Sequence, residues 1–129
     1  MKGPRDHAQA LLKKAANDLV AASATLSTGQ ALDTVCFHAQ QAVEKSLKAI
    51  LALHEIEYPW WHDLGELFEL VRPLASELIP FEDQMFRMTP YAVAVRYDEE
   101  FEPSLDEAGE ALEVAKEIHR LSSNIIYTM

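Results

Sequence analysis

Apolar side chains recur every three or four residues along three long stretches of the chain. The first stripe consists of Ala8, Leu12, Ala15, Leu19, Ala22 and Leu26, and the second of Leu32, Cys36, Ala39, Val43, Ser46, Ile50 and Leu53. The third consists of Leu105, Ala108, Leu112, Ala115, Ile118, Leu121 and Ile125. This spacing places each set on one face of an α-helix. No stretch combines alternating apolar and polar residues with a hairpin turn, so strands are not expected.

Turn and capping residues predict where the helices begin and end. Gly29 suits the left-handed position after a helix, and Asp63 and Ser104 each precede a Glu by three residues, as in a capping box. Prolines after residue 59 interrupt the middle of the chain. We therefore predict helices over 5–27, 31–54, 63–77 and 104–127, with one or two short helices within 81–97. Because short connections favour antiparallel neighbours, the sequence predicts an all-α, up-and-down bundle of four to five helices.

Size and composition indicate one folded domain that does not coat nucleic acid. The 129 residues, of which 49% are apolar and 25% charged, fit a single domain over 1–129. The net charge is −10, and residues 61–129 carry the whole excess, with 15 acidic against 5 basic side chains. Non-specific DNA binding draws on a basic surface, so we do not expect it.

The cysteine count and the apolar runs point to a reducing compartment. Cys36 is the only cysteine, which excludes an internal disulfide and a cysteine-rich zinc site. The N-terminal segment carries charges throughout, and no apolar run approaches the roughly 20 residues that span a bilayer. We expect a cytoplasmic protein without a membrane segment.

The helix over 31–54 carries a second, polar face. At about 100° per residue, Phe37, Gln41, Glu44 and Lys48 share an arc opposite the apolar stripe, with Lys45 beside it. A solvated face with an i, i+4 pair between Glu44 and Lys48 is one interpretation. Since Phe37 is a large aromatic, packing of this face on another segment or a second subunit is the favoured alternative. The third interpretation is that this face lines a ligand-binding site.

This helix and two later segments also resemble a known family. The run FHAQQAVEKSLKA over residues 37–49 is similar to the second-helix signature of HEPN domains. His62-Asp63-Leu64 and Arg96-Tyr97-Asp98 fall where that family has its corresponding segments. The resemblance spans about residues 6–126 and implies a four- to five-helix bundle, commonly homodimeric.

The resemblance implies two kinds of function. Many small HEPN proteins form a two-component, toxin–antitoxin-like system with a minimal nucleotidyltransferase, and some are metal-independent ribonuclease toxins. Those ribonucleases use an Arg and a His separated by four to six residues, and no arginine of this chain has a histidine at that distance. We therefore expect a nucleotide- or RNA-associated binding and regulatory component without catalytic residues. The alternatives are a ribonuclease toxin with a non-standard site and a structural dimerisation module.

The candidate ligand-binding residues combine that polar face with the family's other segments. They are Gln41, Glu44, Lys45, Lys48, His62, Arg96 and Tyr97. Lys45, Lys48 and Arg96 are the cations that the resemblance puts in its signature positions, and we expect them to contact the phosphate if the protein holds a nucleotide. His62 could instead cap a helix, and Arg96 could instead pair with the acidic residues beside it.

No cofactor or metal is expected. The di-iron motif Glu-x-x-His is absent, and the four glycines are too dispersed for a phosphate-binding loop.

Two further segments suggest contacts with partners. Bulky aromatic residues occupy the connection Tyr58-Pro59-Trp60-Trp61, where we expect one to pack on the next helix and another to be exposed. The acidic segment 98–110 precedes and begins the last helix. One interpretation is that these carboxylates interact favourably with the positive end of the helix dipole. The other is that they dock a basic partner surface, in which case binding would weaken with salt.

Overall fold

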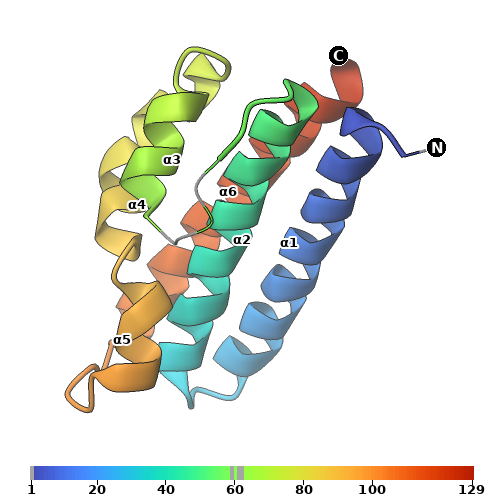
Figure 1. Ribbon diagram of the computed structural model, residues 1–129. Coiled ribbons are helices and arrows are strands. Elements are labelled where there is room, and N and C mark those ends of the chain that lie inside the picture. The colour runs from blue at the N-terminus through green and yellow to red at the C-terminus, as the bar shows by residue number, and fades with distance from the viewer. Residues whose placement is uncertain (1, 59, 61–62) are drawn as a thin grey trace.

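Three long helices pack side by side and set the shape of the molecule (Figure 1). They are α1 (Pro4–Ser27), α2 (Leu32–Leu53) and α6 (Leu105–Thr128), and each contacts the other two. The structure is a computed structural model that describes residues 2–58, 60 and 63–129. α1 runs antiparallel to α2 and α6, so the N- and C-termini lie at the same end of the bundle.

The chain between α2 and α6 folds into shorter helices. They are α3 (Leu64–Val71), the 3-10 helix η1 (Ser76–Phe81), α4 (Glu82–Met88) and α5 (Tyr91–Tyr97). α2 contacts α3, α4 and α5 in addition to α1 and α6, which makes it the central helix. No strand occurs among the described residues. The predicted all-α class is confirmed.

Local capping explains the end of α1 and the starts of α3 and α6. Gly29, just beyond α1, has a φ of +69°, the left-handed conformation that glycine adopts at little cost. The Ser104 hydroxyl accepts from the Glu107 amide at 3.0 Å, and the Glu107 carboxylate accepts from the Ser104 amide at 3.1 Å. The Asp63 carboxylate accepts from the amides of Gly65 and Glu66 at 2.9 and 3.2 Å. The side chains that the sequence nominated as caps therefore cap α3 and α6.

The third helix is shorter than predicted. The expected span 63–77 ends as a regular helix at Val71, and η1 begins only at Ser76. Pro73 is the physical reason, because proline lacks the amide hydrogen that would continue the helical hydrogen bonds. The segment expected to hold one or two short helices forms α4 and α5, separated by Pro90.

The three apolar stripes form the core. Ala8, Leu12 and Ala15 are buried in α1, and the stripe of α6 is buried from Ala108 to Ile118. Leu105, at the start of α6, departs from the expectation with 56% of its surface exposed. Small side chains along α1 and α2 allow these helices to lie close together, which places side chains of α1 beside the polar residues of α2.

The polar face of α2 does not project into solvent, which corrects the view of it as a solvated face. Only 3% of Glu44 is exposed, and only 11% of the Lys48 side chain. The reason is that α2 contacts α1, α3, α4, α5 and α6, and Tyr58 in the connection to α3 lies over Lys48. Other segments of the chain therefore cover Glu44 and most of Lys48, as the favoured alternative predicts, whereas Phe37 and Gln41 remain partly exposed.

No helix among the described residues is long and apolar enough to cross a membrane.

Candidate functional site

A chain of polar contacts runs along α2 through three of the seven candidate residues. Gln41 donates to the side-chain oxygen of Gln40 at 2.6 Å, and Gln40 donates to the Glu44 carboxylate at 3.2 Å. The other oxygen of Glu44 accepts from Lys48 Nζ at 3.1 Å, one helical turn on. Gln40 and Glu44 are both buried, so the contacts satisfy groups that would otherwise be costly to bury. The structure thus joins Gln41, Glu44 and Lys48.

The connection between α2 and α3 covers one end of this chain. Lys48 Nζ lies 5.4 Å from the centroid of the Tyr58 ring, a cation–π distance. The Tyr58 hydroxyl lies 3.2 Å from Nε2 of His7 on α1. A lysine, an aromatic ring and an imidazole from three segments therefore meet where this polar chain reaches the surface.

Lys45 faces a different neighbour. Its Nζ donates to Asp18 on α1 at 2.6 Å, and Nδ1 of His38 lies 2.9 Å from the other Asp18 oxygen. Asp18 is 8% exposed and holds both partners from α2. This cluster fixes α1 against α2. The structure therefore separates Lys45 from the chain that contains Lys48.

Of the remaining three candidates, only Tyr97 has its side chain among the described residues. His62 lies outside the described residues. The backbone of Arg96 is in the last turn of α5, and its side chain is outside the described part of the chain. Tyr97 ends α5 with 75% of its surface exposed and lines a groove that involves only the first turn of α2.

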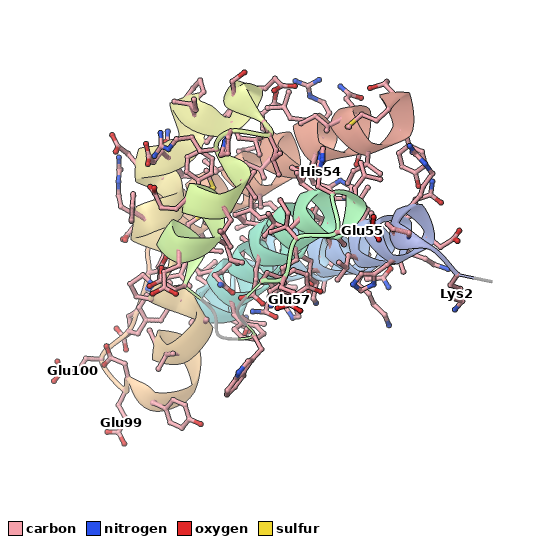
Figure 2. All side chains as sticks on the ribbon, turned by 45° about the horizontal axis from the view of Figure 1, so that its top comes forward. Lys2, His54, Glu55, Glu57, Glu99 and Glu100 are labelled. Atoms are coloured by element: carbon pink, nitrogen blue, oxygen red, sulfur yellow. The ribbon has the colours of Figure 1, made fainter. Side chains whose placement is uncertain are left out.

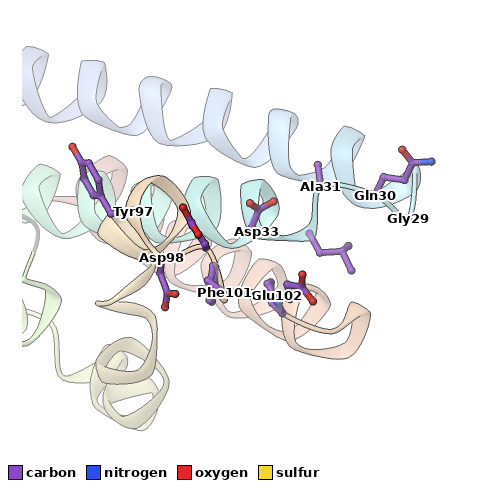
Figure 3. Close-up of a pocket in the computed structure, with 11 residues that line it drawn as sticks. Gly29, Gln30, Ala31, Asp33, Tyr97, Asp98, Phe101 and Glu102 are labelled. Carbon is purple, nitrogen blue, oxygen red and sulfur yellow. The ribbon is translucent and has the colours of Figure 1, made fainter.

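That groove lies between the α1–α2 loop and the α5–α6 loop (Figure 3). It has a volume of about 670 Å³ and opens widely to solvent. One wall runs from Gly29 to Asp33, and the other carries Tyr97, Asp98, Glu99, Phe101, Glu102 and Pro103. In the view of Figure 3, Phe101 and Glu102 lie nearest to Asp33 and Ala31, and Tyr97 lies at the end of the groove away from Gly29 and Gln30.

The groove is acidic on both walls. Asp33 contributes one carboxylate and the facing loop contributes Asp98, Glu99 and Glu102, while none of the described lining residues is basic. Glu99 and the neighbouring Glu100 project outward from the end of α5 (Figure 2). The sequence identifies the acidic loop but not the opposite wall of the groove. Asp33 is far from that loop in the chain, and no motif around it indicates a binding site.

Two titratable groups behind this acidic region have raised pKa values. Burial, assisted by the charges of Glu107 and Asp33, raises the pKa of the Cys36 thiol to about 12. Burial is also the main cause of the raised pKa of Tyr91. Cys36 is therefore a protonated core residue rather than a nucleophile. In the described part of the chain, no group of three or more His, Cys, Asp or Glu side chains could hold a metal ion.

In the aromatic connection between α2 and α3, one residue is exposed and another packs on the core, as expected. Trp60 is 83% exposed and Tyr58 is half-buried against the core. Pro59 and Trp61 lie outside the described residues.

Comparison with known proteins identifies the family. The fold resembles the crystal structure of TT1696 from Thermus thermophilus, with a TM-score of 0.79 and 24% sequence identity. The match covers 92% of this chain and 98% of the other. No curated protein matches the sequence. The family model of the HEPN domain matches residues 8–125. This chain therefore belongs to the HEPN domain family.

Proposed function

We propose that this protein is a non-catalytic binding and regulatory component whose acidic groove docks a basic segment of a partner protein. The observation that carries the proposal is the groove itself, with carboxylates on both walls and no basic side chain among its described lining residues. A concave acidic surface concentrates field lines and attracts a cationic segment over several ångströms. Tyr97, with 75% of its surface exposed, lines the same groove.

The class of partner follows from the family resemblance. Many small HEPN proteins act with a minimal nucleotidyltransferase in a toxin–antitoxin-like pair, and we propose the same partnership here. The sequence lacks the Arg and His spacing of the family's ribonucleases, which favours a regulatory role over a nuclease. The net charge of −10 adds to the attraction of any basic partner.

A labelled oligolysine peptide tests the groove directly. We expect Asp98→Asn/Glu102→Gln to weaken binding about tenfold at low salt, because both carboxylates line the groove. The affinity of the unmodified protein should fall steeply as salt is added, since these charges are exposed. Fluorescence anisotropy at several salt concentrations measures both effects.

A matched pair of substitutions separates the groove from the overall charge. Glu77→Gln/Asp83→Asn removes the same charge at exposed positions on η1 and α4 that do not line the groove. We expect this pair to change the affinity less than about twofold. Equal losses in the two double variants would mean that the peptide senses only net charge, and the groove proposal would be wrong.

A nucleotide is the second candidate ligand, supported by the meeting of Lys48, Tyr58 and His7. The phosphate of the nucleotide would form an ion pair with Lys48, and its base would stack on the Tyr58 ring. Glu44 competes for Lys48 at 3.1 Å, so binding requires the ion pair to open. We expect Lys48→Ala to abolish binding of ATP in calorimetry and Glu44→Gln to strengthen it. No heat from ATP with either the unmodified protein or Glu44→Gln would exclude this site.

We also propose that the protein is a homodimer, as the family resemblance implies. Exposed apolar side chains support an interface: Phe86 on α4 and Val93 on α5 are 51% and 53% exposed. Light scattering should give twice the chain mass for the unmodified protein and a lower mass for Val93→Lys. A monomer at all concentrations would contradict the proposal.

A further inference from the structure

A small cavity between α4 and α6 combines an apolar floor with charged walls of both signs. Its volume is about 140 Å³, and Met88, Ala111 and Val114 supply the floor. Glu107 and Glu110 stand on the α6 side, whereas Arg87 stands on the α4 side. The cavity and the acidic groove have no described lining residue in common, so they are separate sites.

Most polar groups around this cavity have hydrogen-bonding capacity to spare, although one Glu107 oxygen already accepts from the Ser104 amide. Among the described residues, Arg87 and Glu110 form no side-chain ion pair, and the Tyr91 hydroxyl has no hydrogen-bond partner. Gln84 adds an amide that can donate or accept. The Tyr91 ring packs against Phe101, with ring centroids 5.4 Å apart.

Size limits what the cavity can accept. Drug-sized ligands occupy pockets of about 300–1,000 Å³, whereas an apolar cavity of about 150 Å³ accommodates benzene. A volume of about 140 Å³ therefore suits a compact apolar group of comparable size. The walls offer Glu107 and Glu110 as partners for a cation on that group and Arg87 as a partner for an anion.

We propose that this cavity binds a free apolar α-amino acid. Its ammonium would pair with the two carboxylates of α6, its carboxylate with Arg87, and its side chain would rest on the apolar floor. Tyr91 supports this arrangement because it lines the cavity and its phenol can donate a hydrogen bond to the ligand carboxylate.

Leucine and its two half-molecules test the proposal. We expect L-leucine to bind with a dissociation constant of the order of 1 mM, as a small ligand with two ionic contacts does. 3-Methylbutylamine lacks the carboxylate and 4-methylpentanoate lacks the ammonium, so each should bind at least about tenfold more weakly. Amide chemical-shift changes during NMR titration give the affinities and locate the site.

Substitutions on the two walls should act on different ends of the ligand. Arg87→Gln should weaken leucine about tenfold and leave the amine unchanged, while Glu110→Gln should weaken leucine and the amine but not 4-methylpentanoate. Glu113→Gln, an exposed residue of α6 outside the cavity, is the matched control.

Three results would overturn the proposal. They are the absence of saturable shifts with leucine, binding of either half-molecule as tight as that of leucine, and equal effects of Glu110→Gln and Glu113→Gln. Because the three substituted residues are exposed, loss of the fold is not expected to obscure the outcome.

Discussion

Lys48 and Glu44 form an ion pair, 3.1 Å long, on the central helix of the bundle, with 11% and 4% of their side chains exposed. Tyr58 covers the lysine, and Gln40 donates to the second oxygen of the glutamate. Charges in such surroundings lose most of their hydration, and their mutual attraction offsets that loss only when the pair is intact.

Removing one partner of this pair should cost more than replacing both. We expect Lys48→Met to lower the free energy of unfolding by about 2 kcal/mol, because Glu44 is then buried without its lysine. The double variant Glu44→Gln/Lys48→Met should recover most of the loss, since the new amide oxygen still accepts from Gln40. Urea denaturation followed by circular dichroism measures both. A double variant that is less stable than Lys48→Met would show that the charge pair is not the cause.

Two glycines should respond to alanine in opposite directions. A Cβ at Gly109 meets nothing within 4 Å, so Gly109→Ala should stabilise α6 by about 0.7 kcal/mol. Gly29 has a φ of +69°, so Gly29→Ala should destabilise the protein by about 1 kcal/mol. Thermal melts of the two variants should shift up and down, respectively. An upward shift for Gly29→Ala would contradict the left-handed geometry at Gly29, and a downward shift for Gly109→Ala would contradict the open helical position of Gly109.

Cys36 should remain unreactive while the protein is folded. Its pKa is raised to about 12, chiefly by burial, whereas the unfolded thiol titrates near 9. The folded state therefore holds its proton more tightly, and the corresponding stability is present below about pH 9 and is lost as the pH rises toward 12.

Alkylation and alkaline denaturation check this behaviour. At pH 9 we expect iodoacetamide to modify Cys36 in urea but not in the native protein. Cys36→Ala should flatten the loss of stability above pH 9, because the only thiol is gone. Rapid alkylation of the native protein would show that the thiol is accessible.

The helices follow from local features that the sequence displays. The apolar spacing of α1, α2 and α6 and the capping by Asp63 and Ser104 act over a few residues, so they can be recognised without the fold. The end of α3 at Val71 could also have been placed, because Pro73 follows two positions later.

The candidate site depended on contacts that the sequence does not display. Glu44 is buried because of neighbours from other helices, and Lys48 is covered by Tyr58, which follows after the end of α2. Lys45 turns toward Asp18 because α1 packs on that side. The groove joins Asp33 to Asp98, residues that only the antiparallel arrangement of the bundle brings together.

The affinity of this protein for a minimal nucleotidyltransferase encoded in the same genome tests the central claim most directly. Purified partners should form a complex that weakens as salt is added, and Asp98→Asn/Glu102→Gln should weaken it about tenfold while Glu77→Gln/Asp83→Asn leaves it nearly unchanged. Calorimetry that detects no complex, or a complex equally tight when the groove carboxylates are neutralised, would contradict the account.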